Sequence, residues 1–310
     1  MNLEQALKDY LRVRRSLGFR LQQQGSALWN FVAFLRAQGA SYITTELALR
    51  WATQPAKAHP AQWAWRLGRV RRFAIWYSAT EPRTEIPPAG LLPHRRRRKP
   101  PHIYSDEEIE RLLRHTQQLS SRKGLRWCTF TTLFGLLVAT GMRVNEALSL
   151  DQPDVDFDRG VLHVQRTKFG KSRYVVVHPS TVDALKKYAE ARSRLFPAPP
   201  TQAFFISERG SRITGGTARY TFAKLCQQLG LRVPAKYHGR GPRLHDLRHR
   251  FAVRTLIHWY HTGLDVEREL PKLATYLGHV HVNESYWYLE AVPELLQLAT
   301  DRLIAREGKQ

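Results

Sequence analysis

A proline-rich basic segment near residue 90 constrains most strongly how this chain can fold. Residues 81–101 contain six prolines and a run of five cations: Arg95, Arg96, Arg97, Arg98 and Lys99. Proline lacks the amide hydrogen that a helix interior needs, and a run of like charges repels itself and extends the chain. We therefore predict a linker over 81–101 that separates a domain at 1–80 from a second domain at 102–310.

The first domain has the apolar spacing of helices. Apolar side chains recur three or four positions apart in four stretches, which include Leu3, Leu28, Leu47 and Trp65 near their starts. This spacing places the apolar side chains on one face of a helix. The last stretch also carries a series of arginines: Arg66, Arg69, Arg71 and Arg72. We predict a small all-α domain of four short helices.

The second domain combines helices with a short β-region. An apolar helix is expected over 125–140. Alternating residues at 161–165 and β-branched residues at 174–177 flank a polar, glycine-containing turn at 167–172, which predicts a β-hairpin. Further helices are expected near 179–195, 216–229, 244–260, 266–277 and 293–304. The predicted fold class is mainly α with a small β-sheet, so that the second domain is α+β.

The charge balance indicates a polyanionic partner. The 310 residues include 49 Lys and Arg against 26 Asp and Glu, a net charge of +23. More than half of this excess lies in residues 1–101, which hold 18 basic and 5 acidic residues. Neutralising phosphates and releasing their counterions makes such a surface bind nucleic acid. A merely basic, soluble surface is the alternative, and composition does not decide between the two.

Cysteine usage and hydropathy exclude other classes of protein. The two cysteines, Cys128 and Cys226, lie far apart in apolar helical contexts. They exclude a disulfide scaffold and a cysteine-based zinc finger, and they fit a reducing compartment. The charged start of the chain is no signal peptide, and the most apolar stretch, 130–142, is too short to span a bilayer. We expect a cytoplasmic, nucleoid-associated protein with no membrane partner.

Two motifs resemble cofactor sites but lack essential residues. His245 and His249 are spaced like half of a zinc site on a helix, but no H-E-x-x-H motif is present. The sequence at 170–172, Gly-Lys-Ser, resembles the end of a P-loop, but Gln165 stands where the first glycine should be. We therefore expect neither a metal nor a cofactor.

Four short motifs together supply the groups that cleave a phosphodiester with a tyrosine. They provide two arginines, a lysine, histidines and a tyrosine. A phenol oxygen can attack phosphorus while two arginines hold the non-bridging oxygens and stabilise the transition state. A lysine can protonate the leaving oxygen, and a histidine can accept or return the tyrosine proton.

The order and spacing of these motifs resemble the tyrosine recombinases of the phage-integrase and Xer type. The family motif T-G-x-R-x-x-E matches residues 140–146, and the lysine of the hairpin turn matches Lys168. The H-x-L-R-H motif matches 245–249, and L-G-H matches 277–279. The nucleophile usually follows that last histidine by nine residues, which gives Tyr288. The resemblance covers nearly the whole chain.

This resemblance implies roles for the residues that match the motifs. Tyr288 would form a 3′-phosphotyrosine and release a 5′ hydroxyl. Arg143 and Arg248 would hold the scissile phosphate, and Lys168 would be the general acid. The energy of the broken bond would stay in the phosphotyrosine, so that religation needs no ATP.

Supporting roles follow from the same resemblance. His245 would assist proton transfer, His279 would hydrogen-bond the phosphate, and Glu146 would orient neighbouring groups. Tyr286 is the rival nucleophile, but positions 286 and 288 point about 200° apart on a helix, so only one can face the phosphate. Lys171 is the rival acid.

The resemblance also implies the architecture and the partners. It predicts a SAM-like helical core-binding domain, a linker and a catalytic domain on double-stranded DNA. Four protomers would join two DNA sites through a Holliday junction, with related or accessory subunits as further partners. Backbone contacts to DNA are expected from seven basic residues: Arg69, Arg72, Arg95, Arg96, Arg97, Arg98 and Lys99. The helix expected near 293–304 either packs on its own domain or docks into a neighbouring protomer.

Three functions are compatible with these residues. The first is site-specific recombination: the sequences at 286–289, Tyr-Trp-Tyr-Leu, and at 293–296, Pro-Glu-Leu-Leu, look like those of the transposon-associated recombinases. A type IB topoisomerase-like nicking and closing enzyme would use the same chemistry without a specific site. A recombinase shell acting only as a DNA-binding accessory factor is the third, and the complete residue set argues against it.

Overall fold

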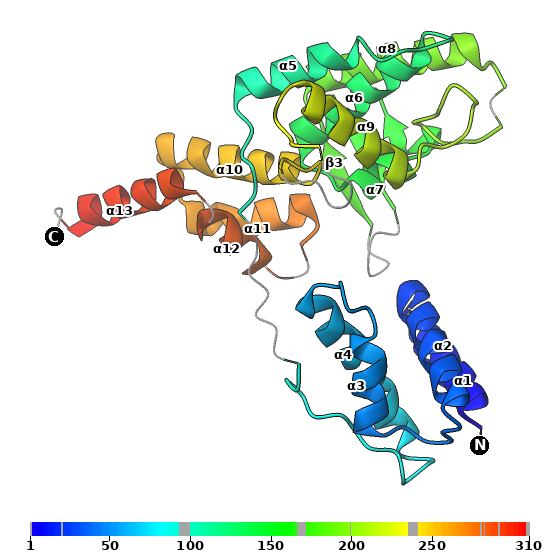
Figure 1. Ribbon diagram of the computed structural model, residues 1–310. Helices are drawn as coiled ribbons and strands as arrows, with labels where there is room; N and C mark the ends of the chain where they lie inside the picture. The colour runs from blue at the N-terminus through cyan, green and yellow to red at the C-terminus, as the bar shows by residue number, and fades with distance from the viewer. Residues whose placement is uncertain are drawn as a thin grey trace. The chain divides into compact units, whose positions relative to one another are not determined.

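The computed structural model describes residues 2–19, 21–92, 100–165, 172–198, 200–234, 241–279, 281, 283–290 and 292–307. The chain divides into two compact units, residues 1–99 and 100–310 (Figure 1). The predicted general acid Lys168, its rival Lys171 and the run Arg95–Lys99 lie outside the described residues.

The first unit contains four helices. They are α1 (Leu3–Ser16), α2 (Gln22–Ala37), α3 (Thr45–Thr53) and α4 (Pro60–Tyr77). Asn2 caps α1 by accepting from two amides of its first turn, Thr44 caps α3, and Pro60 takes the first position of α4. Trp51 is fully buried in the core of this unit, where its ring lies 5.1 Å from that of Phe31.

Part of the predicted linker packs on the first unit. The amide of Glu85 donates to the Ile43 carbonyl at 2.8 Å, and its carboxylate accepts from the Thr45 amide at 2.7 Å. Thr84 is buried, and Leu92 packs against the core of this unit. Residues 81–92 therefore differ from the expected extended segment, because their backbone and side chains find partners on the turn before α3.

The second unit is mainly helical around a three-stranded sheet, which confirms the predicted fold class. Its strands β1 (Val155–Asp156), β2 (Val161–Val164) and β3 (Arg173–Val176) are antiparallel in the order β1-β2-β3, with Leu162 opposite Val175. The two-residue strand β1 was not predicted. The helices, with one short 3-10 turn, are α5 (Asp106–Thr116), α6 (Leu125–Thr140), α7 (Val144–Ser149), η1 (Gln152–Asp154), α8 (Pro179–Leu195), α9 (Gly215–Gln228), α10 (Asp246–His261), α11 (Val266–Leu277), α12 (Asn283–Glu290) and α13 (Pro293–Glu307).

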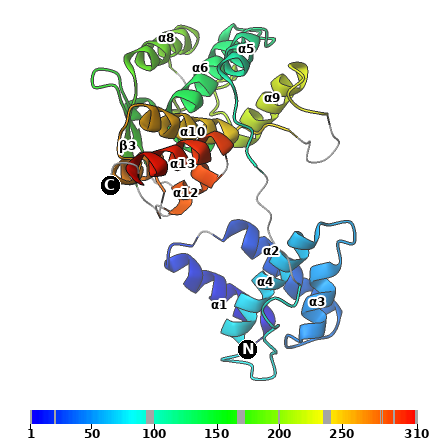
Figure 2. The same ribbon diagram turned by 90° about the vertical axis from the view of Figure 1, so that its left-hand side faces the viewer.

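The apolar helix α6 is the centre of the second unit. It packs against α5, α8 and α10, and its buried side chains include Leu133, Phe134 and Leu137 (Figure 2). The helix ends at Gly141, whose φ of +61° belongs to the left-handed region that favours glycine. A Cβ atom at Gly141 would lie 2.7 Å from the Phe251 ring, so this glycine also lets α10 approach.

The C-terminal helix α13 packs on its own unit. It contacts α10 and α12, and Arg302 donates to the Leu264 carbonyl. These contacts agree with packing on its own domain, and docking of this helix into a neighbouring protomer stays a prediction. Among the described residues, no helix is long and apolar enough to cross a membrane.

Candidate active site

Arg143 follows the glycine that ends α6 and is the N-cap residue of α7. Its backbone amide donates to Glu146 Oε2 at 3.1 Å, and its guanidinium donates to Glu146 Oε1 at 2.8 Å. The side chain is about one-third exposed. Part of the guanidinium is therefore open to an anion, while the salt bridge to Glu146 fixes the rest.

Glu146 is a buried carboxylate shared by two arginines. Only 7% of its side chain is exposed, and Arg173 of β3 donates to its Oε2 at 2.8 Å. Burial by itself raises the pKa of Glu146, but hydrogen bonds and charge from Arg173 and then from Arg143 outweigh it and hold this pKa below its ordinary value. Glu146 is therefore ionised at neutral pH and orients both guanidinium groups.

Arg248 lies on α10 and is almost completely buried. Its Nη1 donates to the Gly141 carbonyl at 2.9 Å and its Nη2 to the Leu277 carbonyl at 2.8 Å. Burial lowers its pKa, whereas the neighbouring Tyr288 phenol acts to raise it. An arginine stays charged at neutral pH in a protein, so Arg248 supplies a fixed positive charge beside Tyr288.

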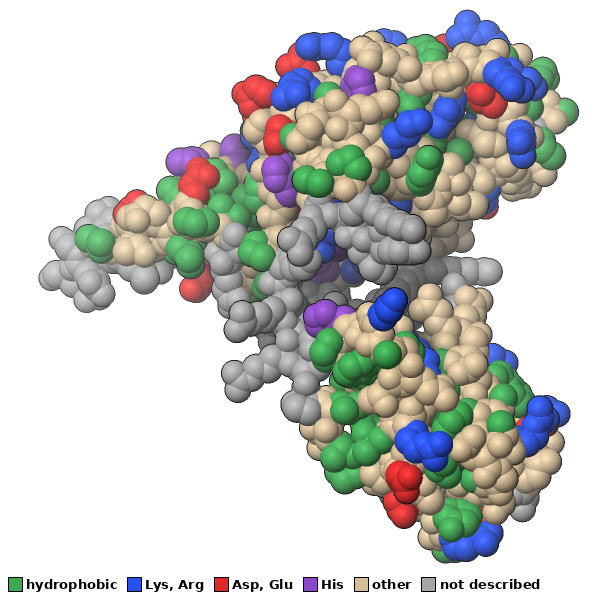
Figure 3. Space-filling view, viewed as in Figure 1, with side chains coloured by type: hydrophobic (Ala, Val, Ile, Leu, Met, Phe, Trp, Pro, Cys, Tyr) green, Lys and Arg blue, Asp and Glu red, His purple; other side chains and the backbone are tan. Residues whose placement is uncertain are grey.

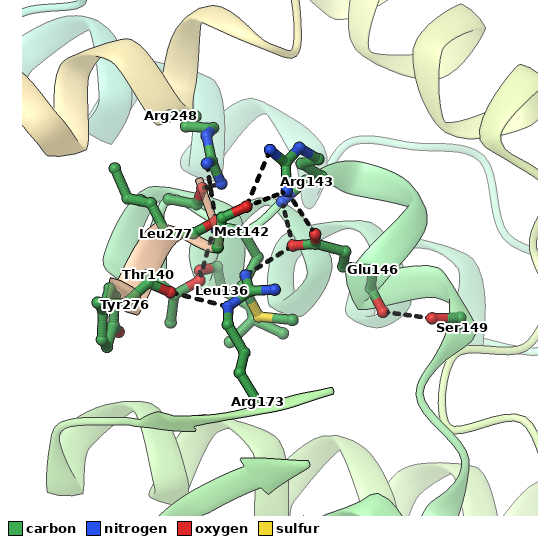
Figure 4. A network of polar contacts seen from close by, with 12 residues as sticks. Leu136, Thr140, Met142, Arg143, Glu146, Ser149, Arg173, Arg248, Tyr276 and Leu277 are labelled. Atoms are coloured by element: carbon green, nitrogen blue, oxygen red, sulfur yellow. Dashed lines mark hydrogen bonds and ion pairs between the residues drawn. The ribbon is translucent and has the colours of Figure 1, made fainter. Parts of the chain in front are cut away.

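Arg143, Glu146, Arg173 and Arg248 form one set of linked contacts, which we call the arginine network. Figure 4 shows Arg143 and Arg173 pointing at Glu146, with Arg248 directed at the end of α11. Arg143 also donates to the Gly278 carbonyl at 3.3 Å from both terminal nitrogens. The sequence motifs at 140–146, 245–249 and 277–279 therefore meet in space.

His279 and Tyr288 lie side by side. Their rings stack with centroids 5.9 Å apart, and His279 Nδ1 is 2.7 Å from Ser285 Oγ. Tyr288 is 3% exposed, whereas Tyr286 is 46% exposed. The two tyrosines of α12 therefore point to different sides, and Tyr288 is the one directed at His279.

One further histidine, His249 of α10, contacts Tyr288, and His245 contacts His249. The ring of His249 lies 5.3 Å from that of Tyr288 and 4.8 Å from that of Trp287, and it meets His245 edge to face at 5.0 Å. We call His245, His249, His279, Trp287 and Tyr288 the ring cluster. The buried Nδ1 of His249 has no hydrogen-bond partner in the part of the chain that the structure describes.

The histidines of the ring cluster are neutral at pH 7. Desolvation, followed by the charge of Arg248, lowers the pKa of His245 to about 4 and the pKa of His279 to about 3. His245 nevertheless keeps an exposed edge. Burial followed by the charge of His245 lowers the pKa of His249 to about 4. A neutral imidazole accepts a proton, which is the property that a base for a phenol needs.

The predicted DNA contacts on α4 belong to the first unit. Arg72 is exposed and Arg69 is half-buried. Two neighbouring arginines have intramolecular partners, since Arg66 lies 3.7 Å over the Trp51 ring and Arg71 donates to the Pro87 carbonyl. Lys and Arg side chains are dispersed over the visible face of both units (Figure 3).

The sequence analysis assigned no site role to Arg173 or to His249. A usable signal was present for Arg173: alternation along β3 places it on the same side of the strand as Val175, which is fully buried. An arginine at such a position needs a buried partner. Among the described residues, no group of three or more His, Cys, Asp or Glu side chains is arranged to hold a metal ion.

The fold and the site together define a class of protein. Two fixed guanidinium groups, neutral imidazoles and a phenol converge at the ends of α6 and α11, which suits phosphoryl transfer to a tyrosine. The class that combines this chemistry with a helical domain around a small sheet is the tyrosine-type DNA strand transferases.

Comparisons with known proteins support this class. The model of the protein family described as "Phage integrase family" matches residues 103–294. The putative integrase/recombinase y4rB of Sinorhizobium fredii (strain NBRC 101917 / NGR234) is 47% identical over 306 residues, covering 97% of each chain. Tyrosine recombinase XerD of Neisseria meningitidis serogroup A is 28% identical over 235 residues, covering 74% of this chain and 72% of XerD.

A solved structure shares the fold. The Tn1549 transposon integrase in complex with transposon right end DNA has a TM-score of 0.64 and 16% identity, and the match covers 98% of this chain and 100% of the integrase chain. The chain therefore belongs to the phage integrase family, and it is a tyrosine-type site-specific recombinase. The resemblance seen in the sequence is confirmed.

Proposed function

We propose that this recombinase cuts and rejoins double-stranded DNA through a 3′-phosphotyrosine on Tyr288. The observation that carries the proposal is the convergence of Arg143 and Arg248 on the backbone of 277–278, next to the Tyr288 ring stacked on His279. Tyr286 lies on the exposed side of α12 and is not the nucleophile in this proposal.

The chemical step uses groups of this chain. The Tyr288 oxygen attacks phosphorus and forms the phosphotyrosine bond, while the bond from phosphorus to the 5′ oxygen breaks. Arg143 and Arg248 neutralise the charge that grows on the non-bridging oxygens. The phenol proton passes to a neutral imidazole, and His245 is the one with an exposed edge. Lys168 donates the proton that the 5′ oxygen needs.

Rejoining reverses these steps. A 5′ hydroxyl from the partner strand attacks the phosphotyrosine and gives its proton to Lys168, and the phenol leaves with a proton returned by the imidazole. The phosphodiester is replaced by a bond of similar energy, so the exchange requires no nucleotide hydrolysis. His279, fixed on Ser285, is placed to hydrogen-bond the phosphate through its second nitrogen.

The partners follow from this activity. The first unit, with Arg69 and Arg72, and the basic run Arg95–Lys99 would contact the DNA backbone. Exchange between two duplexes needs four nucleophiles, so we propose a homotetramer on two sites, with a Holliday junction as intermediate. The description of the Tn1549 protein as a transposon integrase supports a role for this recombinase in a mobile element. In this proposal it acts in the cytoplasm, on nucleoid DNA.

Covalent trapping tests the proposal. A pool of duplexes with a randomised central sequence and a nick beside the cleavage position lets the released fragment diffuse away, so that cleavage leaves a stable protein–DNA adduct. We expect wild type and Tyr286→Phe to form the adduct and Tyr288→Phe to form none. An adduct that survives Tyr288→Phe contradicts the nucleophile assignment, and no adduct with wild type contradicts the proposed chemistry.

A further inference from the structure

We propose that Arg173 of β3 is a positioning residue that holds both phosphate-binding arginines in place. The inference rests on the proposed function, because it assigns Arg143 and Arg248 to the scissile phosphate. Arg173 itself does not touch the phosphate in this proposal. It acts through two intermediaries, the Glu146 carboxylate and the backbone at the end of α11.

Three consecutive carbonyls at the end of α11 each accept from a different arginine. The Tyr276 carbonyl accepts from Arg173 Nε at 2.8 Å, the Leu277 carbonyl from Arg248 at 2.8 Å, and the Gly278 carbonyl from Arg143 at 3.3 Å. The last carbonyls of a helix lack intrahelical partners and carry its negative dipole end. This row of acceptors therefore fixes the spacing of the three guanidinium groups.

Arg173 is more buried than Arg143, one of the two arginines that it positions. Its Nη2 donates to Glu146 Oε2 at 2.8 Å, and its side chain is 11% exposed, against 34% for Arg143. A Cβ atom on Gly278 would lie 2.8 Å from Arg173 Nη1, so the guanidinium lies directly against this glycine. Tyr276 also links α11 to β3, because its hydroxyl donates to the Val176 carbonyl at 3.1 Å.

Loss of Arg173 would remove the guanidinium partner of Glu146 Oε2, which would keep only the Arg143 backbone amide as a donor. The charged groups around this carboxylate are Arg143, Arg173 and, further away, Arg248. Without Arg173, the guanidinium of Arg143 can take both carboxylate oxygens in a bidentate pair. That pair would draw Arg143 away from Gly278 and from the phosphate, and misplacement by about 1 Å can cost about 10²-fold in rate.

Arg212 provides a matched control. It donates to the Leu148 and Leu150 carbonyls and pairs with Asp151 at the other end of α7, so it makes the same kinds of contact as Arg173. It contacts neither Glu146 nor the 276–278 backbone in these bonds. Arg212→Gln therefore reports the cost of losing a structural arginine beside α7.

The test compares single-turnover cleavage of a phosphate and a methylphosphonate at the scissile position. The substrate is the nicked duplex recovered from the randomised pool. A methyl group in place of one non-bridging oxygen removes the negative charge that the arginines neutralise. We expect Arg173→Gln to slow cleavage of the phosphate about 10²-fold and to slow cleavage of the methylphosphonate far less, with DNA affinity unchanged. Arg173→Lys, which keeps the positive charge but has one donor nitrogen in place of the two that Arg173 uses, should fall between wild type and Arg173→Gln.

The outcomes separate the inference from a structural role and from the proposed function. Equal slowing on both substrates, wild-type rates for Arg173→Gln and Arg173→Lys, or the same substrate-dependent loss in Arg212→Gln would each overturn the inference. If Arg173→Gln does not fold, Arg173→Lys is used instead, and its slowing on the phosphate is compared with its slowing on the methylphosphonate in the same way. Tyr288→Phe is measured in parallel: cleavage by that variant contradicts the proposed function, whatever the rates at position 173.

Discussion

In the arginine network, charged hydrogen bonds of 2.8–3.3 Å fix each guanidinium, whereas in the ring cluster the nucleophile is held mainly by ring contacts with centroids 5.3–6.0 Å apart. A hydrogen bond to a charged group contributes about 1.5–3 kcal/mol, and an aromatic pair about 0.5–1.5 kcal/mol beyond its buried area. The arginine side chains are therefore preorganised by directional contacts, whereas the short helix that carries Tyr288 is held mainly by ring contacts, together with the hydrogen bond between Ser285 and His279.

This difference suits the two tasks. The charge that grows on the phosphate is best met by dipoles and cations that need not reorganise. In the proposed function Tyr288, which is 3% exposed, must instead leave its buried position in order to meet a DNA phosphate.

The largest expected effect comes from the network. Arg143→Ala should lower the cleavage rate by about 10³-fold, because it removes a preorganised donor to the developing charge. Because the Arg143 side chain is about one-third exposed, we expect the variant to fold. Most of the DNA affinity should persist, since other basic residues would contact the other phosphates. Trapping kinetics and a binding titration measure the two quantities. If affinity collapses together with cleavage, Arg143 is a binding residue instead.

A packing change at the start of the network should have an intermediate effect. In Gly141→Ala the added Cβ meets Phe251 at 2.7 Å, and the left-handed backbone adds about 1–2 kcal/mol of strain. We expect lower stability in urea and slower cleavage, because Gly141 also supplies a carbonyl to Arg248. Gly124→Ala is the control: its φ is +77° with nothing within 4 Å of the Cβ, so it should lose the strain energy alone. Equal cleavage by both variants would break the link between Gly141 and the site.

Substitutions of His249 in the ring cluster should separate the effect of its ring shape on stability and cleavage from the effect of its polar nitrogens. His249→Phe keeps a ring against Tyr288 and removes a buried nitrogen that lacks a described partner, a defect that costs about 1–3 kcal/mol. We expect thermal stability equal to or above that of wild type, and cleavage within a few-fold of it. His249→Ala should lower both, since it removes the ring that α12 packs on. Loss of cleavage in His249→Phe would instead show that the imidazole takes part in proton transfer.

The smallest expected effect is a pH dependence of stability. The unfolded chain protonates its histidines near pH 6.5, whereas His249 in the fold does so only near pH 4. The unfolded state therefore binds more protons between these values, and the free energy of unfolding should fall as the pH drops from 6.5 towards 4. Urea titrations at several pH values measure this slope, which His249→Phe should reduce. An unchanged slope in that variant would place the pKa of His249 near its ordinary value.

The local features of the site could be predicted from the sequence. The apolar helix predicted at 125–140 has these bounds in the structure, and Gly141 follows its last residue. This prediction depends on the spacing of residues within one or two turns of each other. The same reasoning placed Tyr286 and Tyr288 on different sides of a helix, as the structure has them.

The long-range features could not be predicted. Arg173 is 27 residues from Glu146 and 103 residues from Tyr276, and no local periodicity relates such positions. The burial of His249 depends on α12 folding back onto α10. The two-residue strand β1 is too short to show an alternation, and residues 81–92 have the composition of a linker while their partners lie near residue 43.

Mapping the trapped adduct tests the central claim most directly. The adduct that wild-type protein forms on the nicked duplex would be digested, and fragmentation of the DNA-linked peptide would identify the modified residue and the DNA end attached to it. We predict a phosphodiester between Tyr288 and a 3′ phosphate. A DNA link on Tyr286 or on any other residue, or a bond to a 5′ phosphate, would contradict the account.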